Sequence, residues 1–464
     1  MILRNKSISP FLAFLCLVSL SRGLMPPNNE QDSAPTTSNA VTKQTTFRLA
    51  HAFHRGGTVA PDSFAQMDWD PSEIKAECDA TGRQSYYTVS TIHEVMPSFV
   101  EQGGADSGSG NVRTQLRAMP NARDVDTVRA MAYMTLDSYT EPVKKEWVPV
   151  DGWNASLPFG WDSDGIRGYV FKSDDEDVLV IAIKGTSAQV FGIGGGPTSK
   201  RDKYNDNMMF SCCCAKVDRS WTPICDCCQD STTCSVSCVQ KQANFADSYY
   251  NLAESIYLQA RIMYPRASIW FTGHSLGGAL AALLAFTNGA PAFAYEAPGD
   301  VLYASRLGLL PPPRNHDSVP DYSWLFDMLP IYHFGNAQDP IFLGVCNGAS
   351  SSCYYGGYAL ETRCHVGKTC LYDPEEYQKP MTDSNGRPIL RKVDAPVRHT
   401  LPKEVRQPVE TAEDPKLVRA SANLDIRMHS MVRAIETYFD KWEYVPECRV
   451  EKACVDCETW SFVE

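Results

Sequence analysis

A Gly-x-Ser-x-Gly pentapeptide at residues 273–277 constrains this chain more than any other feature. The apolar run before it, at 267–272, predicts a buried strand. The small and apolar residues at 276–286 predict the helix that follows, and Asn288-Gly289 is a helix stop signal. A strand, a sharp turn and a helix around such a serine form a nucleophile elbow, whose glycines let the backbone pass close to its neighbours. The pattern predicts that Ser275 is a catalytic nucleophile.

Predicted strands and helices alternate around this turn. Apolar runs at 169–171 and 178–183 predict two paired strands, and 242–264 has the apolar periodicity of a helix. Further strands are predicted at 292–295 and 331–334. Because strands that alternate with helices build parallel sheets, the chain is predicted to be α/β. We expect an α/β-hydrolase fold with a mostly parallel central sheet and disulfide-rich insertions.

The predicted organisation is one large catalytic domain with appendages. Residues 1–24 have a basic start and a short apolar core, which predicts a signal peptide or a signal anchor. The regular pattern is interrupted by a proline-rich interval, which predicts a mobile surface insertion. The other predicted parts are a polar linker at 25–60, the hydrolase domain at 61–445 and a cysteine-containing C-terminal tail at 446–464. The insertion lies within the hydrolase domain, at 372–421.

Charge and cysteine content indicate the partners and the compartment. A net charge of −12 argues against a nucleic-acid partner. Most of the 17 cysteines cluster at 212–238, 346–370 and 448–457. Zinc ligation is the alternative to disulfides, but paired Cys-x-x-Cys motifs with a histidine at ligand spacing do not occur. We therefore expect disulfides in an oxidising lumen, with no metal and no cofactor, and Asn154 as a candidate glycosylation site there.

A serine hydrolase of this fold needs an acid and then a histidine, in that chain order. Asp339 follows a late predicted strand and is the predicted acid, with Asp300, at the end of the strand next after the elbow, as the alternative. Of the downstream histidines, His365 lies between cysteines and His399 lies in the proline-rich interval. His429 directly precedes the apolar stripe of a terminal helix, which is a place where an imidazole can be held firmly, so it is the predicted base.

Two backbone amides are predicted to form the oxyanion hole. One belongs to Leu276, at the N-terminus of the helix after the elbow. The other belongs to Thr186, in the turn that follows the predicted strand at 178–183. The glycine cluster at 192–196 does not open a helix after a strand, so it does not predict a nucleotide site.

These motifs together resemble the class 3 lipases. The matching residues are the elbow, the Ile183-to-Thr186 turn, the Asn336-to-Pro340 segment and the late His429. Within that family, the chain is similar to a fungal vacuolar group associated with autophagy, over roughly residues 45–464. The segments that carry this closer similarity are 206–214, 295–300, 333–340, 356–362 and 454–457.

The resemblance implies a catalytic triad of Ser275, Asp339 and His429. It also implies a single-pass type II membrane glycoprotein, held to the membrane through its N-terminus and sorted through multivesicular bodies to the vacuole. The implied substrates are acyl esters of membrane phospholipids and neutral lipids, in autophagic and endosomal vesicles. The alternatives are a lumenal serine esterase, peptidase or acyltransferase with a non-membrane substrate, and a catalytically dead binding protein with a hydrolase fold.

Overall fold

The structure is a computed structural model of the whole chain. It describes residues 43–55, 87–98, 113–140, 165–173, 178–187, 199–215, 223–311, 321–348, 350–374, 381–382, 388–389 and 424–464. The predictions for the N-terminal segment at 1–24, for Asn154 and for His399 lie outside these residues. So does most of the predicted insertion at 372–421.

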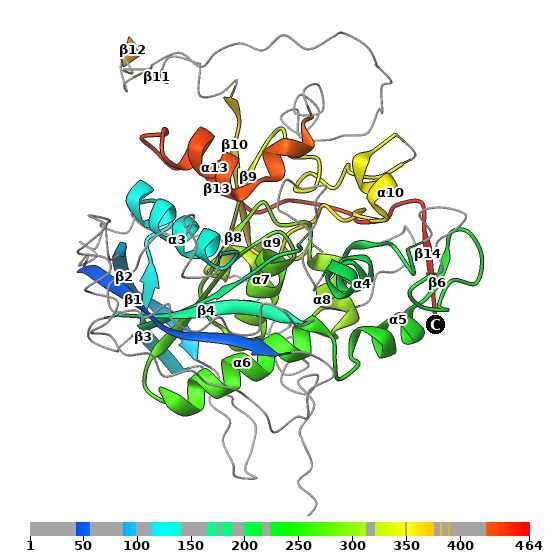
Figure 1. The fold of residues 1–464 in the computed structure, drawn as a ribbon, viewed down its shortest axis with the longest axis horizontal. Coiled ribbons are helices and arrows are strands. Elements are labelled where there is room, and N and C mark those ends of the chain that lie inside the picture. The colour runs from blue at the N-terminus through cyan, green and yellow to red at the C-terminus, as the bar shows by residue number, and fades with distance from the viewer. Residues whose placement is uncertain are drawn as a thin grey trace, which may run out of the picture.

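A ten-stranded sheet with the order β13-β10-β9-β8-β7-β5-β4-β1-β2-β3 forms the centre of the molecule (Figure 1). Its five central strands are parallel, which confirms the predicted parallel core. These strands are β5 Val178–Ile183, β7 Ser268–His274, β8 Ala292–Tyr295, β9 Ile331–Asn336 and β10 Lys368–Tyr372. The flanking strands pair antiparallel and are β1 Lys43–Arg55, β2 Tyr87–Ser98, β3 Arg113–Pro120, β4 Ile166–Ser173 and β13 Cys448–Arg449.

Helices cover both faces of this sheet. Successive side chains of a strand point to opposite faces, so the apolar residues of a buried strand need a covering layer on each side. On β5, Ile181 packs under α6 Tyr249–Met263 and α7 Leu276–Asn288. Val180 faces the other way, toward α3 Val125–Asp137 and the C-terminal pair α13 Met431–Ala434 and η4 Ile435–Phe439. The remaining elements are α4 Ser199–Phe210, α5 Val236–Ala243, α8 Val301–Arg306, α9 Ser323–Met328, α10 Ser352–Gly356, η3 Ile426–His429 and the short pairs β6 Thr233–Ser235 with β14 Ser461–Val463 and β11 Met381–Thr382 with β12 Pro388–Ile389.

Three predicted boundaries differ from the structure. The predicted helix at 242–264 is two helices, because Ser248 begins α6 as an N-cap whose side chain accepts from the Asn251 amide. The predicted linker at 25–60 is wrong in part, since β1 pairs with β2 and β4 inside the main sheet. Its polar, alternating sequence suits an antiparallel flank, where both faces need not be apolar. The predicted tail at 446–464 is likewise folded, since it contributes β13 and β14.

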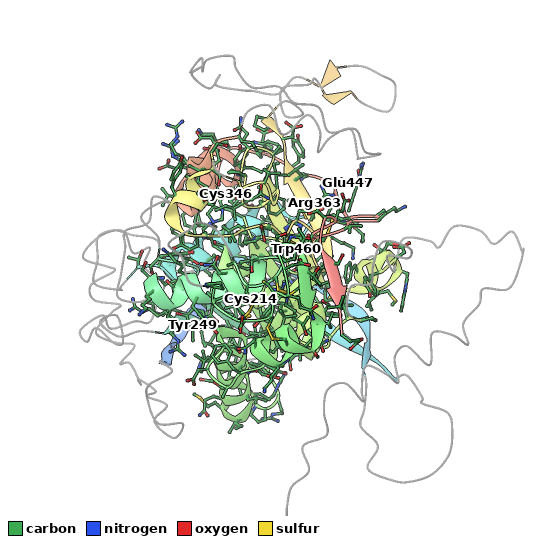
Figure 2. The ribbon with its side chains drawn as sticks, turned by 90° about the vertical axis from the view of Figure 1, so that its right-hand side faces the viewer. Cys214, Tyr249, Cys346, Arg363, Glu447 and Trp460 are labelled. Atoms are coloured by element: carbon green, nitrogen blue, oxygen red, sulfur yellow. A yellow bond between two sulfur atoms is a disulfide. The ribbon has the colours of Figure 1, made fainter. Side chains whose placement is uncertain are left out.

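Seven disulfides connect all the described cysteines except Cys228, which confirms the disulfide prediction. Two groups of cysteine sulfurs lie close enough for a metal, but every member except Cys228 is already oxidised to a disulfide and has no thiolate to offer. Cys214 and Trp460, labelled in Figure 2, belong to the cluster that these bonds tie together. The pairs are 212–457, 213–234, 214–225, 227–238, 346–353, 364–454 and 370–448.

Within the described part of the chain, no helix combines the length and the apolar character needed to cross a bilayer.

Candidate active site

Ser275 lies on a strained turn between β7 and α7. Its φ of 57° and ψ of −130° are sparsely populated by non-glycine residues, a strain that is typical of functional sites. A Cβ on Gly273 would lie 2.2 Å from the Gly277 carbonyl oxygen, and one on Gly277 would lie 2.2 Å from the Ile183 carbonyl oxygen. No residue with a Cβ therefore fits in place of either glycine, which is the physical reason for the two glycines of the Gly-x-Ser-x-Gly pattern.

A chain of hydrogen bonds joins Ser275, His429 and Asp339. The Ser275 hydroxyl lies 2.8 Å from His429 Nε2, and His429 Nδ1 lies 2.7 Å from Asp339 Oδ2. Ser275 is only 4% exposed, and the other two residues are fully buried. Because the carboxylate can only accept, Nδ1 carries a proton and Nε2 is left free to receive the serine proton. The arrangement can activate a serine nucleophile.

Neighbouring elements fix the acid and the base from several sides. Asp339 follows β9, and its Oδ1 accepts from the Ile341 amide at 2.9 Å. His429 ends η3, and its backbone carbonyl accepts from His274 Nε2 at 2.7 Å. The preceding Met428 carbonyl accepts from the Asn336 side chain at 3.2 Å. Both partners of Ser275 are thus held before any substrate arrives.

The alternative residues lie elsewhere. Asp300 accepts from the Val366 amide at 2.8 Å and lies 3.8 Å from His333, and burial raises its pKa to about 7. His365 Nδ1 lies 3.1 Å from Glu451, and its Nε2 lies 3.0 Å from the Ala297 carbonyl. In the part of the chain that the structure describes, neither Asp300 nor His365 forms a hydrogen bond with the Ser275 hydroxyl.

The predicted oxyanion donors lie beside the serine. A Cβ on Gly185 would come within 3.1 Å of the Ser275 Cβ, so the turn that holds Thr186 passes directly against the elbow. Leu276 begins α7, where amide groups point outward. In the described part of the chain, neither the Thr186 amide nor the Leu276 amide has an acceptor. Both are available to stabilise negative charge.

Two contacts around this turn were not predicted from the sequence. The Thr186 hydroxyl donates to Asp206 of α4 at 2.6 Å, and burial raises the pKa of Asp206 well above its usual range. The Tyr139 hydroxyl lies 2.7 Å from Nδ1 of His274, the ring that also holds His429. Burial lowers the pKa of His274 well below its usual value, so the ring is neutral, accepting at Nδ1 and donating at Nε2.

Comparison with known proteins identifies lipases as relatives of this chain. The family model "Lipase (class 3)" matches residues 213–288. A Cryptococcus neoformans protein described as "Putative lipase ATG15" is 38% identical over 370 residues, covering 75% of this chain and 69% of its own length. The protein of the same description from Saccharomyces cerevisiae strain YJM789 is 49% identical over 259 residues, covering 55% of this chain and 48% of its own length.

Among solved structures, the Lip2 lipase from Yarrowia lipolytica matches 52% of this chain and 76% of its own, with 17% identity and a TM-score of 0.25. The sequence relatives carry the assignment, because the Cryptococcus protein is matched over more than two thirds of its length. The activity that goes with this assignment is that of a lipase, a carboxylic ester hydrolase. The chain belongs to the family of fungal lipases named ATG15, within the class 3 lipases.

Proposed function

We propose that Ser275, His429 and Asp339 are the catalytic triad of this lipase and that its substrates are the acyl esters of membrane lipids. The observation that carries the triad is the continuous hydrogen-bonded chain from the Ser275 hydroxyl to the Asp339 carboxylate. Each member has the role that its position allows: nucleophile, proton carrier and orienting acid.

In the first half of the reaction, His429 Nε2 takes the Ser275 proton while the serine oxygen attacks the ester carbonyl carbon. The negative charge that forms on the carbonyl oxygen is stabilised by the amides of Thr186 and Leu276. The imidazolium is held by Asp339 and returns its proton to the leaving alcohol, which leaves an acyl-serine. In the second half, His429 activates water, which releases the fatty acid and restores the serine.

The proposed location is the lumen of the vacuole, reached through multivesicular bodies, with residues 1–24 as a type II signal anchor. The disulfides support a lumenal catalytic domain. The seven disulfides need an oxidising compartment to form and persist. The resemblance to the autophagy-associated group supports membrane phospholipids and triacylglycerols of autophagic and endosomal vesicles as the substrates, and Asn154 as a glycosylation site.

Product analysis on vesicles tests the proposal. The purified chain is incubated with vesicles of phosphatidylcholine that contain triacylglycerol, at acidic and at neutral pH, and free fatty acids are measured. Ser275→Ala should lower fatty acid release by about a thousandfold or more, because no other group replaces the nucleophile. The control is Ser255→Ala, which removes a part-buried hydroxyl on α6 that donates to the Leu252 carbonyl at 2.6 Å and should leave the rate unchanged.

The other outcomes distinguish the alternatives. Activity of Ser275→Ala above a tenth of the wild-type rate would remove Ser275 from the mechanism. Cleavage of a soluble short-chain ester without release from vesicles would favour an esterase with a non-membrane substrate. Absence of both activities, together with no labelling by a fluorophosphonate, would favour a binding protein.

A further inference from the structure

Glu296 occupies an unfavourable position next to the site. It directly follows β8, and its φ of 45° lies in the left-handed region, which is unfavourable for a residue other than glycine. Its carboxyl group is also buried, with 1% of the residue exposed, which adds a desolvation cost. Strain and burial at the same residue indicate a functional constraint.

The contacts of Glu296 lead to the proposed catalytic acid. Its Oε1 accepts from the Asn336 side chain at 2.8 Å, and its Oε2 accepts from the Asn336 amide at 3.1 Å. The same carboxyl lies close enough to Asp339 for the charge of Asp339 to act on it. Asn336 in turn donates to the Met428 carbonyl, one residue before His429. Glu296 therefore lies beside Asp339. It also contacts Asn336, which holds the backbone next to His429.

A hydrogen bond between two carboxyl groups needs one proton between them. Asp339 already accepts hydrogen bonds at both of its oxygens, from the Ile341 amide and from His429 Nδ1. Burial and then the charge of Asp339 raise the pKa of Glu296 well above its usual range. The shared proton therefore belongs to Glu296, which acts as the donor, and Asp339 is the acceptor.

The other titratable groups around Glu296 do not change this assignment. Tyr372 of β10 and Tyr438 of η4 also lie near Glu296, and burial raises the pKa of each phenol, so both stay neutral. From η3, His429 faces it through Asp339. Asp339, on the loop after β9, is the one carboxylate in this group.

We propose that Glu296 is a positioning residue of the active site, whose neutral carboxyl donates a hydrogen bond to Asp339 and holds that carboxylate against His429. The inference rests on the proposed triad and extends it to four residues. It has a consequence for pH. When Glu296 loses its proton to solvent, the donor becomes a second negative charge, repels Asp339 and disturbs the His429 contact. Ionisation of Glu296 thus lowers activity on the alkaline side.

The test is the pH profile of kcat on a soluble short-chain ester for three chains: wild type, Glu296→Gln and Glu296→Gly. Glutamine keeps a neutral donor that cannot ionise, so Glu296→Gln should retain activity within about threefold at acidic pH and lose much of the alkaline decline. Glycine removes the donor and accepts the left-handed backbone, so Glu296→Gly should lose about tenfold or more in kcat with little change in KM.

The matched control is Glu361→Gln, which changes a part-buried carboxyl whose pKa is also raised by burial but which accepts from the Cys212 amide, away from the triad. Its pH profile should follow the wild type. An alkaline decline in Glu296→Gln equal to that of wild type would overturn the proposal, and so would full kcat in Glu296→Gly. Ser275→Ala in the same assay separates a failure of the proposed triad from a failure of the Glu296 proposal, because its activity tests the triad alone.

Discussion

His274 Nε2 donates a 2.7 Å hydrogen bond to the backbone carbonyl of His429, and the two rings lie 4.9 Å apart between centroids. The residue before the proposed nucleophile therefore holds the loop that carries the proposed base. Tyr139 completes the arrangement by donating to the other nitrogen of His274. The spacing between Ser275 and His429 is set by this contact as well as by Asp339.

Removing the His274 ring should loosen His429. We expect His274→Ala to lower kcat by about tenfold to a hundredfold, because displacing a reacting group by an ångström has effects of that size. His274→Gln offers an amide donor and should recover part of the loss. The measurement is kcat on a soluble ester. The control is Tyr133→Phe, which removes an exposed hydrogen bond to Asp440. Equal kcat values for His274→Ala and wild type would contradict the expectation.

The hydroxyl of Thr186 should matter through Asp206. Valine has nearly the same shape as threonine, and Thr186→Val leaves the backbone amide of residue 186 in place. It removes the hydroxyl that donates to the buried Asp206 carboxyl at 2.6 Å. The turn that presents the amide then loses its anchor, and we expect kcat to fall about tenfold, less than the hundredfold or more for an oxyanion donor itself. Thr186→Ser restores the hydroxyl and should restore most of the rate. A fully active Thr186→Val variant would show that the hydroxyl has no role.

The central part of the fold could be predicted because its strands are buried on both faces. β5 is a continuous apolar run, and β7 is buried from its second residue onward. The helix after the elbow ends where Gly289 adopts a φ of 58°, as its stop signal predicts. β1 has no such run, because it pairs antiparallel with β2 and β4 at the flank. Its partners are set by long-range pairing, which leaves no local pattern in the sequence.

The site shows the same division. The proposed triad of Ser275, Asp339 and His429 could be predicted because the order of nucleophile, acid and base along the chain follows from the fold. Glu296 and its partner Asn336 are 40 residues apart, and Tyr139 and His274 are 135 apart. Such contacts exist only when distant strand ends meet at the same edge of the sheet, so residue type and spacing do not indicate them.

Stability should fall as the pH rises from neutral to alkaline. Burial alone would lower the pKa of His365, but Glu451 and other carboxyl and carbonyl groups raise it from 6.5 to about 9. The folded state therefore keeps a proton that the unfolded state loses, and its contribution is complete below pH 6.5 and disappears by about pH 9. The loss is about 3 kcal/mol at most. The melting temperature should drop by several degrees between these pH values.

Glu451→Gln provides the control for this pH dependence. It removes the charge that lies 3.1 Å from His365 Nδ1 while keeping a hydrogen-bond acceptor. The melting temperature of Glu451→Gln should be lower than wild type near pH 6.5 and should change less between pH 6.5 and 9. The buried, neutral His274 and His333 oppose this trend only below their usual pKa, so they do not affect the alkaline window. Parallel curves for the two proteins would rule out His365 as the source.

The disulfides should differ in value according to the length of chain that they close. Cys212–Cys457 joins residues 245 apart, and with the other bonds intact it still closes a loop of well over a hundred residues. Cys346–Cys353 closes a loop of 7. By loop entropy, the first is worth about 5 kcal/mol and the second about 2 kcal/mol. Replacing Cys212 and Cys457 together by serine should therefore lower the melting temperature more than the same change at 346 and 353. If the short loop is the more costly one to open, local packing around α10 outweighs chain entropy.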